Sequence, residues 1–210
     1  MRPTSRRTLT RTTATLAAAL ATTALALTTA PTTTAATVIP CTTRTTTTPF
    51  TTWGDKNAYF TLPGGTFDTT PTTTGWTLTG GATITPENEP YKVITSTKAS
   101  SLKMPPGATA TLPTFCVNPV EAAVRFFYKS PGVTGSNLVA TIHTLKGTTA
   151  TDSYAWLDGT KTGWQVSTPI TLPNVGEVGV QLTATITFTQ KNIPATWQID
   201  DFEVDPWKSL

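Results

Sequence analysis

Charged residues are scarce in this chain of 210 residues, because Asp, Glu, Lys and Arg together make up 13% of it. That share is about half of what a soluble globular domain usually carries. The formal net charge is +3, yet no cluster of Lys and Arg occurs beyond the first few residues. Since nucleic-acid surfaces need such a cluster, the sequence argues against nucleic acid as a partner.

Histidine and cysteine are scarce too, with one His and two Cys. His143 lies on a predicted strand without a nucleophile motif such as G-x-S-x-G, which favours a packed or surface residue. Glu87 and Glu89 sit in a turn bounded by prolines. Asp200 and Asp201 are adjacent on a predicted strand and point to opposite faces unless a bulge turns them. We therefore predict that the chain is not an enzyme and has no catalytic cofactor.

The positive charge is concentrated at the N-terminus. Four arginines without an intervening acid open the chain: Arg2, Arg6, Arg7 and Arg11. An uncharged Ala/Leu/Thr stretch follows up to about Ala30, and small residues precede a cleavage point near Ala36. This pattern predicts a secretory signal peptide over residues 1–36 and a secreted, extracellular protein. The run Ser5–Leu9 resembles a twin-arginine signal, and the general secretory route is the alternative.

The same stretch is a poor membrane anchor. It has about 17 apolar residues interrupted by threonines, which is marginal for crossing roughly 30 Å of hydrocarbon. We expect no membrane span in the mature form. Removing the four arginines changes the formal net charge from +3 to about −1, so the basic character belongs to the signal peptide.

Cys41 and Cys116 both remain after cleavage. Two cysteines in an exported protein usually pair. A bridge across 75 residues is worth about 4.5 kcal/mol in the chain-entropy model. The alternative is a lipoprotein acylated at Cys41, but Pro40 replaces the small residue expected before such a cysteine. We predict a structural disulfide.

Threonine makes up about a quarter of the chain and dominates residues 37–49. This segment is interpreted as a flexible lead-in tied down by Cys41, and a glycosylated stalk is the alternative. Since Thr also favours strands, part of the segment could pair as an edge strand.

Short strands are predicted beyond residue 49. In Val180–Thr189 apolar residues occupy every even position and Gln or Thr every odd one, as in an antiparallel strand with one buried face. The other predicted strands are Tyr59–Leu62, Trp76–Leu78, Tyr91–Ile94, Ser101–Met104, Ala122–Tyr128, Leu138–Leu145, Tyr154–Trp156, Gln165–Leu172 and Thr196–Val204. Gly- and Pro-rich turns separate them and no helical period occurs. We predict a single all-β domain over residues 50–210, a two-sheet antiparallel sandwich.

Four motifs resemble those of jelly-roll, galactose-binding-like carbohydrate-binding modules. They are Pro63–Asp68, Gly75–Ala82, Ser100–Met104 and Trp197–Val204. The layout from Cys41 to Trp207 is also similar to that of a group of uncharacterised secreted actinobacterial proteins of this fold. The resemblance implies a jelly roll, and it is weak evidence for a ligand because this fold serves unrelated binding tasks.

The resemblance also implies a structural calcium ion at one end of the sandwich. The matching positions are Asp68 and Asp200 or Asp201, with a backbone carbonyl near Gly64 or Gly65. Calcium prefers such oxygen ligands. The alternative is a set of solvated carboxylates at a sheet end.

Aromatic residues are the candidate ligand surface, because sugars stack on flat rings and need polar groups for their hydroxyls. Trp76 and Trp197 lie in the motifs and are expected in the core, whereas Trp53 and Tyr59 could be either. Tyr154 and Trp156 are two apart on one strand and therefore share a face. Asp158 lies beside them, and Trp164 follows across the Gly159–Gly163 turn, so we predict one aromatic and polar hairpin. For any one of these aromatic residues, packing in the core is the alternative.

The sequence thus predicts a monomeric, secreted, non-catalytic protein that binds a polysaccharide or cell-wall glycan by aromatic stacking. The alternative is a structural or protein-interaction domain of the cell envelope without sugar binding.

Overall fold

The computed structural model describes residues 38–41, 44–68, 75–94, 100–121, 123–173 and 181–205. Residues 35–210 group into one compact unit. The predicted signal peptide over residues 1–36 lies outside the described residues. Within the described ranges, no helix is long and apolar enough to cross a membrane.

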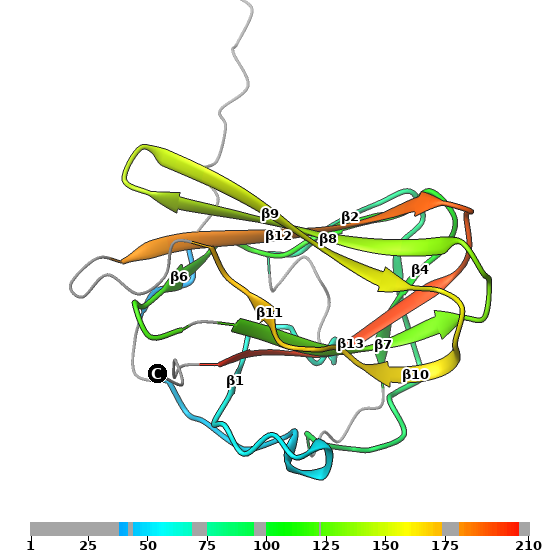
Figure 1. Cartoon of the computed structure of the whole chain (residues 1–210), viewed down its shortest axis with the longest axis horizontal. Helices are drawn as coiled ribbons and strands as arrows, with labels where there is room; N and C mark the ends of the chain where they lie inside the picture. The colour runs from blue at the N-terminus through cyan, green and yellow to red at the C-terminus, as the bar shows by residue number, and fades with distance from the viewer. Residues whose placement is uncertain are drawn as a thin grey trace, which may run out of the picture. The chain divides into compact units, whose positions relative to one another are not determined.

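Two antiparallel sheets pack face to face (Figure 1). Sheet I has the order β10-β7-β13-β4-β3, with β1 also on β13 and β11 also on β7. Its strands are β1 Phe60–Thr61, β3 Thr83–Thr85, β4 Ser101–Met104, β7 Ala123–Pro131, β10 Thr162–Val166, β11 Ile170–Thr171 and β13 Trp197–Asp205. Sheet II has the order β2-β5-β12-β8-β9, with β6 also on β12. Its strands are β2 Thr77–Thr79, β5 Thr109–Thr111, β6 Phe115–Val117, β8 Ser136–Lys146, β9 Thr149–Asp158 and β12 Leu182–Asn192.

The core lies between the sheets and follows from alternation along the strands. In β12 the residues from Leu182 to Phe188 alternate between buried and half-buried positions, as the sequence predicts. Trp197 and Trp76 are both buried in this core, as expected. The predicted all-β sandwich is confirmed, and the described helical structure is one short 3₁₀ turn, η1 (Thr51–Trp53).

Some predicted strands differ from the structure. Three strands of three residues each, β3, β5 and β6, are not predicted, because so short a segment shows no period. The predicted strand Gln165–Leu172 is split into parts of β10 and β11. The predicted strand Tyr91–Ile94 is wrong. There the carboxylate of Glu89 accepts the backbone N–H groups of Tyr91 and Val93, so these groups serve a turn and not a ladder.

A second, smaller hydrophobic cluster covers the outer face of sheet I. Phe127 of β7 points away from the main core and packs against Phe50 and Tyr59, which are fully buried. Asp55 from the same N-terminal segment pairs with Arg125 of β7. This part of the outer face of sheet I is therefore closed by residues 50–59.

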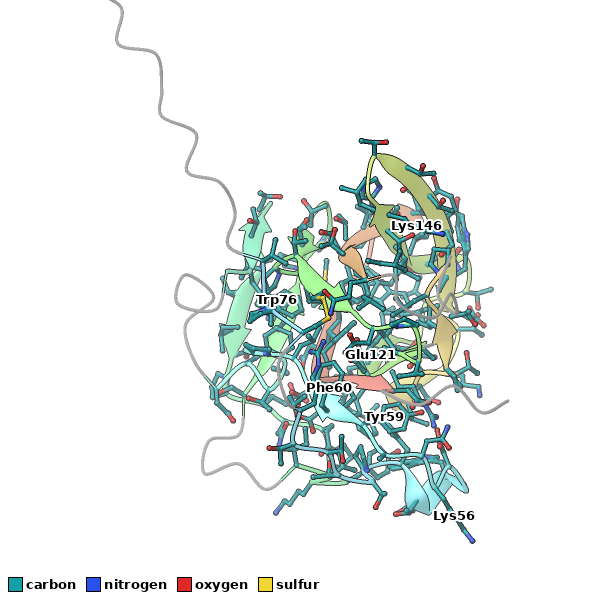
Figure 2. The ribbon with its side chains drawn as sticks, turned by 90° about the vertical axis from the view of Figure 1, so that its left-hand side faces the viewer. Lys56, Tyr59, Phe60, Trp76, Glu121 and Lys146 are labelled. Atoms are coloured by element: carbon teal, nitrogen blue, oxygen red, sulfur yellow. A yellow bond between two sulfur atoms is a disulfide. The ribbon has the colours of Figure 1, made fainter. Side chains whose placement is uncertain are left out.

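The predicted disulfide is confirmed. Cys41 and Cys116 are joined with a Cα–Cα distance of 5.1 Å, and Figure 2 shows the bridge in yellow near Glu121 and Phe60. Arg44 lies between these two residues: its Nε is 3.2 Å from Glu121 Oε1 and its guanidinium lies over the Phe60 ring. Ile39 forms a parallel bridge with Phe115. The described part of the Thr-rich segment is thus held against the sandwich at three points.

Candidate functional site

Tyr154 and Trp156 lie together on the outer face of sheet II. Both belong to β9, which is the last strand of that sheet. Tyr154 is 62% exposed and Trp156 is 58% exposed. Single exposed aromatic side chains are common, but two side by side form an apolar patch, and such patches mark interaction sites when they are large. The predicted sharing of one face follows from their spacing in the strand.

Two rows made mostly of threonines run across sheet II and end at these aromatic residues; in one row the buried Val139 separates the last threonine from Trp156. The strand registers align the first row as Thr79, Thr109, Thr189, Val139 and Trp156. They align the second row as Thr77, Thr111, Thr187, Thr141 and Tyr154. With strands about 4.8 Å apart, each row is roughly 19 Å long. We call this surface the threonine face.

The threonine face carries hydroxyl groups and no charge in its two rows. Neighbouring hydroxyls pair across strands, Thr79 with Thr109 and Thr111 with Thr187. Each hydroxyl can donate one hydrogen bond and accept two, so paired hydroxyls keep capacity for an outside partner. Sequence alternation predicts the outward threonines of β12, but the rows depend on pairing between strands far apart in the chain.

Polar groups flank the aromatic pair at both ends of β9. His143 Nδ1 lies 2.6 Å from Asp152 Oδ1, and both side chains are half exposed. At the other end, the exposed Asp158 accepts hydrogen bonds from the backbone and hydroxyl of Thr160. These two bonds are the main reason that the pKa of Asp158 is lowered.

Trp164 does not join this surface, so the predicted hairpin is wrong. β9 pairs with β8 in sheet II, whereas β10, which carries Trp164, pairs with β7 in sheet I. The chain changes sheets at the turn after Asp158, where the Gly159 N–H donates to the Ser136 carbonyl. Periodicity predicts which way a side chain points within a strand, but it does not predict which sheet the strand joins.

Trp164 packs against the smaller hydrophobic cluster on the outer face of sheet I, and so does Trp53. The Tyr91 ring meets Trp53 edge-on, 4.8 Å between centroids. Glu87 accepts hydrogen bonds from Lys129 and Gln198 next to Trp164, and these bonds lower the pKa of Glu87. Trp53 and Trp164 are only half-buried, but both pack against the smaller hydrophobic cluster, which explains their positions without a ligand.

The acidic residues of β13 lie at a bulge. The register between β13 and β7 shifts between Asp200 and Glu203, and Asp201 has a left-handed backbone with φ of 44°. The carboxyl groups of Asp200, Asp201 and Glu203 are all buried. Burial is the largest cause that raises the pKa of Asp200 to about 9, of Asp201 to about 7 and of Glu203 to about 8. Neighbouring acids raise these pKa values further. Asp201 raises the pKa of Asp200, and Glu89 and Asp68 raise the pKa of Asp201.

The predicted calcium ligands are only partly brought together. Asp201 faces Asp68 closely enough for the two charges to interact, whereas Asp200 turns its oxygens to the backbone N–H groups of Glu89 and Asp201. Asp201 Oδ2 and Glu203 Oε2 are buried and accept no hydrogen bond. In the described part of the chain, no three Asp, Glu, His or Cys side chains are grouped as a metal site. The predicted trio therefore does not form a complete ligand set by itself.

The acidic pairs that a hydrolase would need are hydrogen-bonded, ion-paired or buried. Glu89 accepts the N–H groups of Tyr91 and Val93, and Glu87 is paired with Lys129. Asp200 and Asp201 are buried behind the bulge. None of these four carboxyl groups lies beside Tyr154 and Trp156.

A hollow of about 440 Å³ lies beside the disulfide, away from the aromatic pair. It is lined by Val38, Pro40, Cys41, Cys116, Leu145, Gly147, Gln181, Leu182 and Thr183. This lining carries no charged side chain and no aromatic ring. Gln181 and Thr183 supply polar groups, but the described lining offers no ring on which a sugar could stack.

No protein-family model matches this sequence, and no curated protein matches it. Solved structures with a similar fold include TmCBM61 in complex with β-1,4-galactotriose, at 15% identity, 69% of this chain, 92% of that chain and a TM-score of 0.41. The CBM22-1 xylan-binding domain from Paenibacillus barcinonensis Xyn10C is 16% identical over 72% of this chain and 94% of its own, with a TM-score of 0.44. The C-terminal family 22 carbohydrate-binding module of Clostridium thermocellum Xyn10B is 11% identical over 70% and 94%, with a TM-score of 0.40. The similarity of this chain to these structures is a similarity of fold.

Proposed function

We propose that the chain is a non-catalytic carbohydrate-binding protein whose site is the threonine face with its aromatic edge. The observation that carries the proposal is the exposure of Tyr154 and Trp156 at the ends of two uncharged hydroxyl rows. A pyranose ring can stack on the aromatic side chains through its C–H face. Threonine hydroxyls can then exchange hydrogen bonds with the sugar hydroxyls.

The shape of this surface favours an extended, neutral polysaccharide or cell-wall glycan. The rows cross five strands and offer repeated hydroxyl groups along one direction. A single sugar would use one end of a row, whereas a chain of several units could follow it. Because the rows carry no charge, binding is expected to depend little on salt concentration.

Retention on insoluble polysaccharides and on a glycan array tests the proposal. Trp156→Ala and Tyr154→Ala are each expected to weaken binding roughly tenfold, which corresponds to about 1.4 kcal/mol, since each removes a stacking ring. Trp164→Ala is the matched control, because it removes the same side chain type from the outer face of the other sheet. Melting curves confirm that each variant is folded.

Two results would contradict the proposal. If no glycan retains the folded chain, the alternative of a structural or protein-interaction domain is favoured. If Trp164→Ala abolishes retention while Tyr154→Ala and Trp156→Ala do not, the site lies on sheet I.

Two further features belong to the same proposal. We infer export from the N-terminal pattern, and a disulfide is typical of an oxidising compartment. We also propose that calcium, where present, acts structurally at Asp201 and Glu203, each of which has one buried oxygen without a donor. Carboxylate oxygens are the ligands that calcium prefers, and a complete set would need further oxygens.

A further inference from the structure

The edge of sheet II at β9 is built differently from the other sheet ends. The remaining end strands of the two ordered paths are short: β2 and β3 have three residues each and β10 has five. β9 has ten residues and pairs with β8 in an unbroken register. Proteins protect edge strands by shortness, charged side chains (above all lysine), proline or bulges. β9, with the sequence TATDSYAWLD, is long and regular and has no lysine or proline; its charged side chains are Asp152 and Asp158.

The backbone groups that β9 leaves open can be identified from its register. In a hairpin with a two-residue loop, the closing pair is hydrogen-bonded and every second pair follows. Lys146 and Thr149 close the β8–β9 hairpin, so the odd-numbered residues of β9 bond to β8. The bond from Gly159 N to Ser136 O, 2.8 Å long, continues the same alternation. The even-numbered residues therefore turn their N–H and C=O groups to the outer edge.

Four residues present both of these groups at the edge: Ala150, Asp152, Tyr154 and Trp156. The next even residue, Asp158, differs because its carbonyl already accepts a bond from the Ser130 hydroxyl. Within the described segments, no strand pairs with this edge of β9. A row of eight unpaired backbone groups is a template for another strand.

We propose that two copies of this chain associate through their β9 edges, antiparallel, with a two-fold axis at Ser153. The four open residues are symmetric about Ser153. Ala150 then lies opposite Trp156 of the second copy, and Asp152 lies opposite Tyr154 of the second copy. All eight open backbone groups are used, and no two like charges face each other.

A second copy fits this edge better than an unrelated strand for two reasons. The open groups are self-complementary about one residue, which an isologous interface requires. The cross-strand partners are also compatible, because the small Ala150 meets the large Trp156 and a carboxylate meets a phenol hydroxyl. The sheets II of both copies then form one continuous sheet, and the two Tyr154–Trp156 pairs meet at its centre. The association does not depend on sugar binding.

Sedimentation equilibrium of the purified chain over a range of concentrations tests this association. We expect the mass of two chains at high concentration and of one chain on dilution. Asp152→Pro removes an edge N–H that β8 does not use, and proline is tolerated at such a position. It is expected to weaken the dimer at least tenfold, since two hydrogen bonds are lost per dimer. Asp152→Asn keeps the N–H and is expected to dimerise like the original chain.

Amide hydrogen exchange gives a measurement that needs no variant. The N–H groups of residues 150, 152, 154 and 156 are expected to exchange rapidly on dilution and slowly at high concentration. Those of residues 151, 153 and 155 are expected to be protected at both. A single-chain mass at every concentration, or a dimer in which the even-numbered amides still exchange rapidly, overturns the proposal.

Discussion

At the scale of single residues, the buried carboxyl groups of β13 are the most unusual feature. A buried carboxyl group is stable when it is neutral or paired with a cation. The bulge and the left-handed Asp201 bring three such groups to one strand segment. They make the stability of the fold sensitive to protons or to a metal ion.

Metal-free protein is expected to lose stability as the pH rises. Unfolded carboxyl groups ionise near pH 4, roughly, whereas burial holds the pKa of Asp201 at about 7 and that of Glu203 at about 8. The folded state therefore binds more protons between these values, and the free energy of unfolding falls with rising pH. Asp201→Asn, which tolerates the left-handed backbone, should flatten this dependence. Melting temperatures measured in buffers with a chelator, from about pH 5 to pH 9, give the change of stability with pH. If the melting temperature of Asp201→Asn changes with pH as steeply as that of the original chain, the prediction is wrong.

Calcium added to the metal-free protein at about pH 8 is expected to raise the melting temperature, because a cation would offset the ionised carboxylates. A chelator should reverse the effect. Asp201→Asn is the control that should lose it. An unchanged melting temperature with and without calcium would count against the structural calcium.

At the scale of elements, the pair Arg44–Glu121 fixes the segment before η1 to the sandwich. Glu121 is 1% exposed at its side chain, and burial raises its pKa despite the nearby guanidinium. Burial likewise lowers the pKa of Arg44. The pair is therefore held together where neither ion would be stable alone.

Glu121→Ala is expected to destabilise the protein by roughly 3–5 kcal/mol, because it leaves the guanidinium of Arg44 without its partner. Urea unfolding with the disulfide intact measures the loss. Arg44→Met with Glu121→Leu replaces both ions by apolar side chains and should recover most of it. A loss below about 1 kcal/mol would place the pair among weak surface ion pairs.

Sequence patterns predict long elements better than short ones, as β12 and the segment Tyr91–Ile94 illustrate. β12 is predicted because its alternation spans ten positions, and the outward threonines follow directly. The segment Tyr91–Ile94 also contains apolar residues, but Glu89 takes over its backbone N–H groups from a position that no strand pattern includes. The aromatic pair on β9 is predicted from spacing, whereas the threonine face and the separation of Trp164 depend on strand pairing, which no local pattern specifies.

At the scale of the whole molecule, β13 holds sheet I together. It lies between β7 and β4 and also pairs with β1 (Figure 1). Its inward residues Trp197, Ile199, Phe202 and Val204 are all fully buried. A chain that ends before Trp197 is expected to show no cooperative thermal transition, since β7, β4 and β1 all lose the strand that joins them. A cooperative transition in the shortened chain, followed by circular dichroism, would show that sheet I forms without it.

The position of β13 also sets an order of events during synthesis. A central strand that is made after its neighbours leaves them without a common partner until residues 197–205 have left the ribosome. The nascent chain can form the β8–β9 hairpin early, but sheet I cannot close at that stage. Completion of the fold is thus delayed until nearly the whole described chain is available, and until then the edges of β4 and β7 that face β13 remain open.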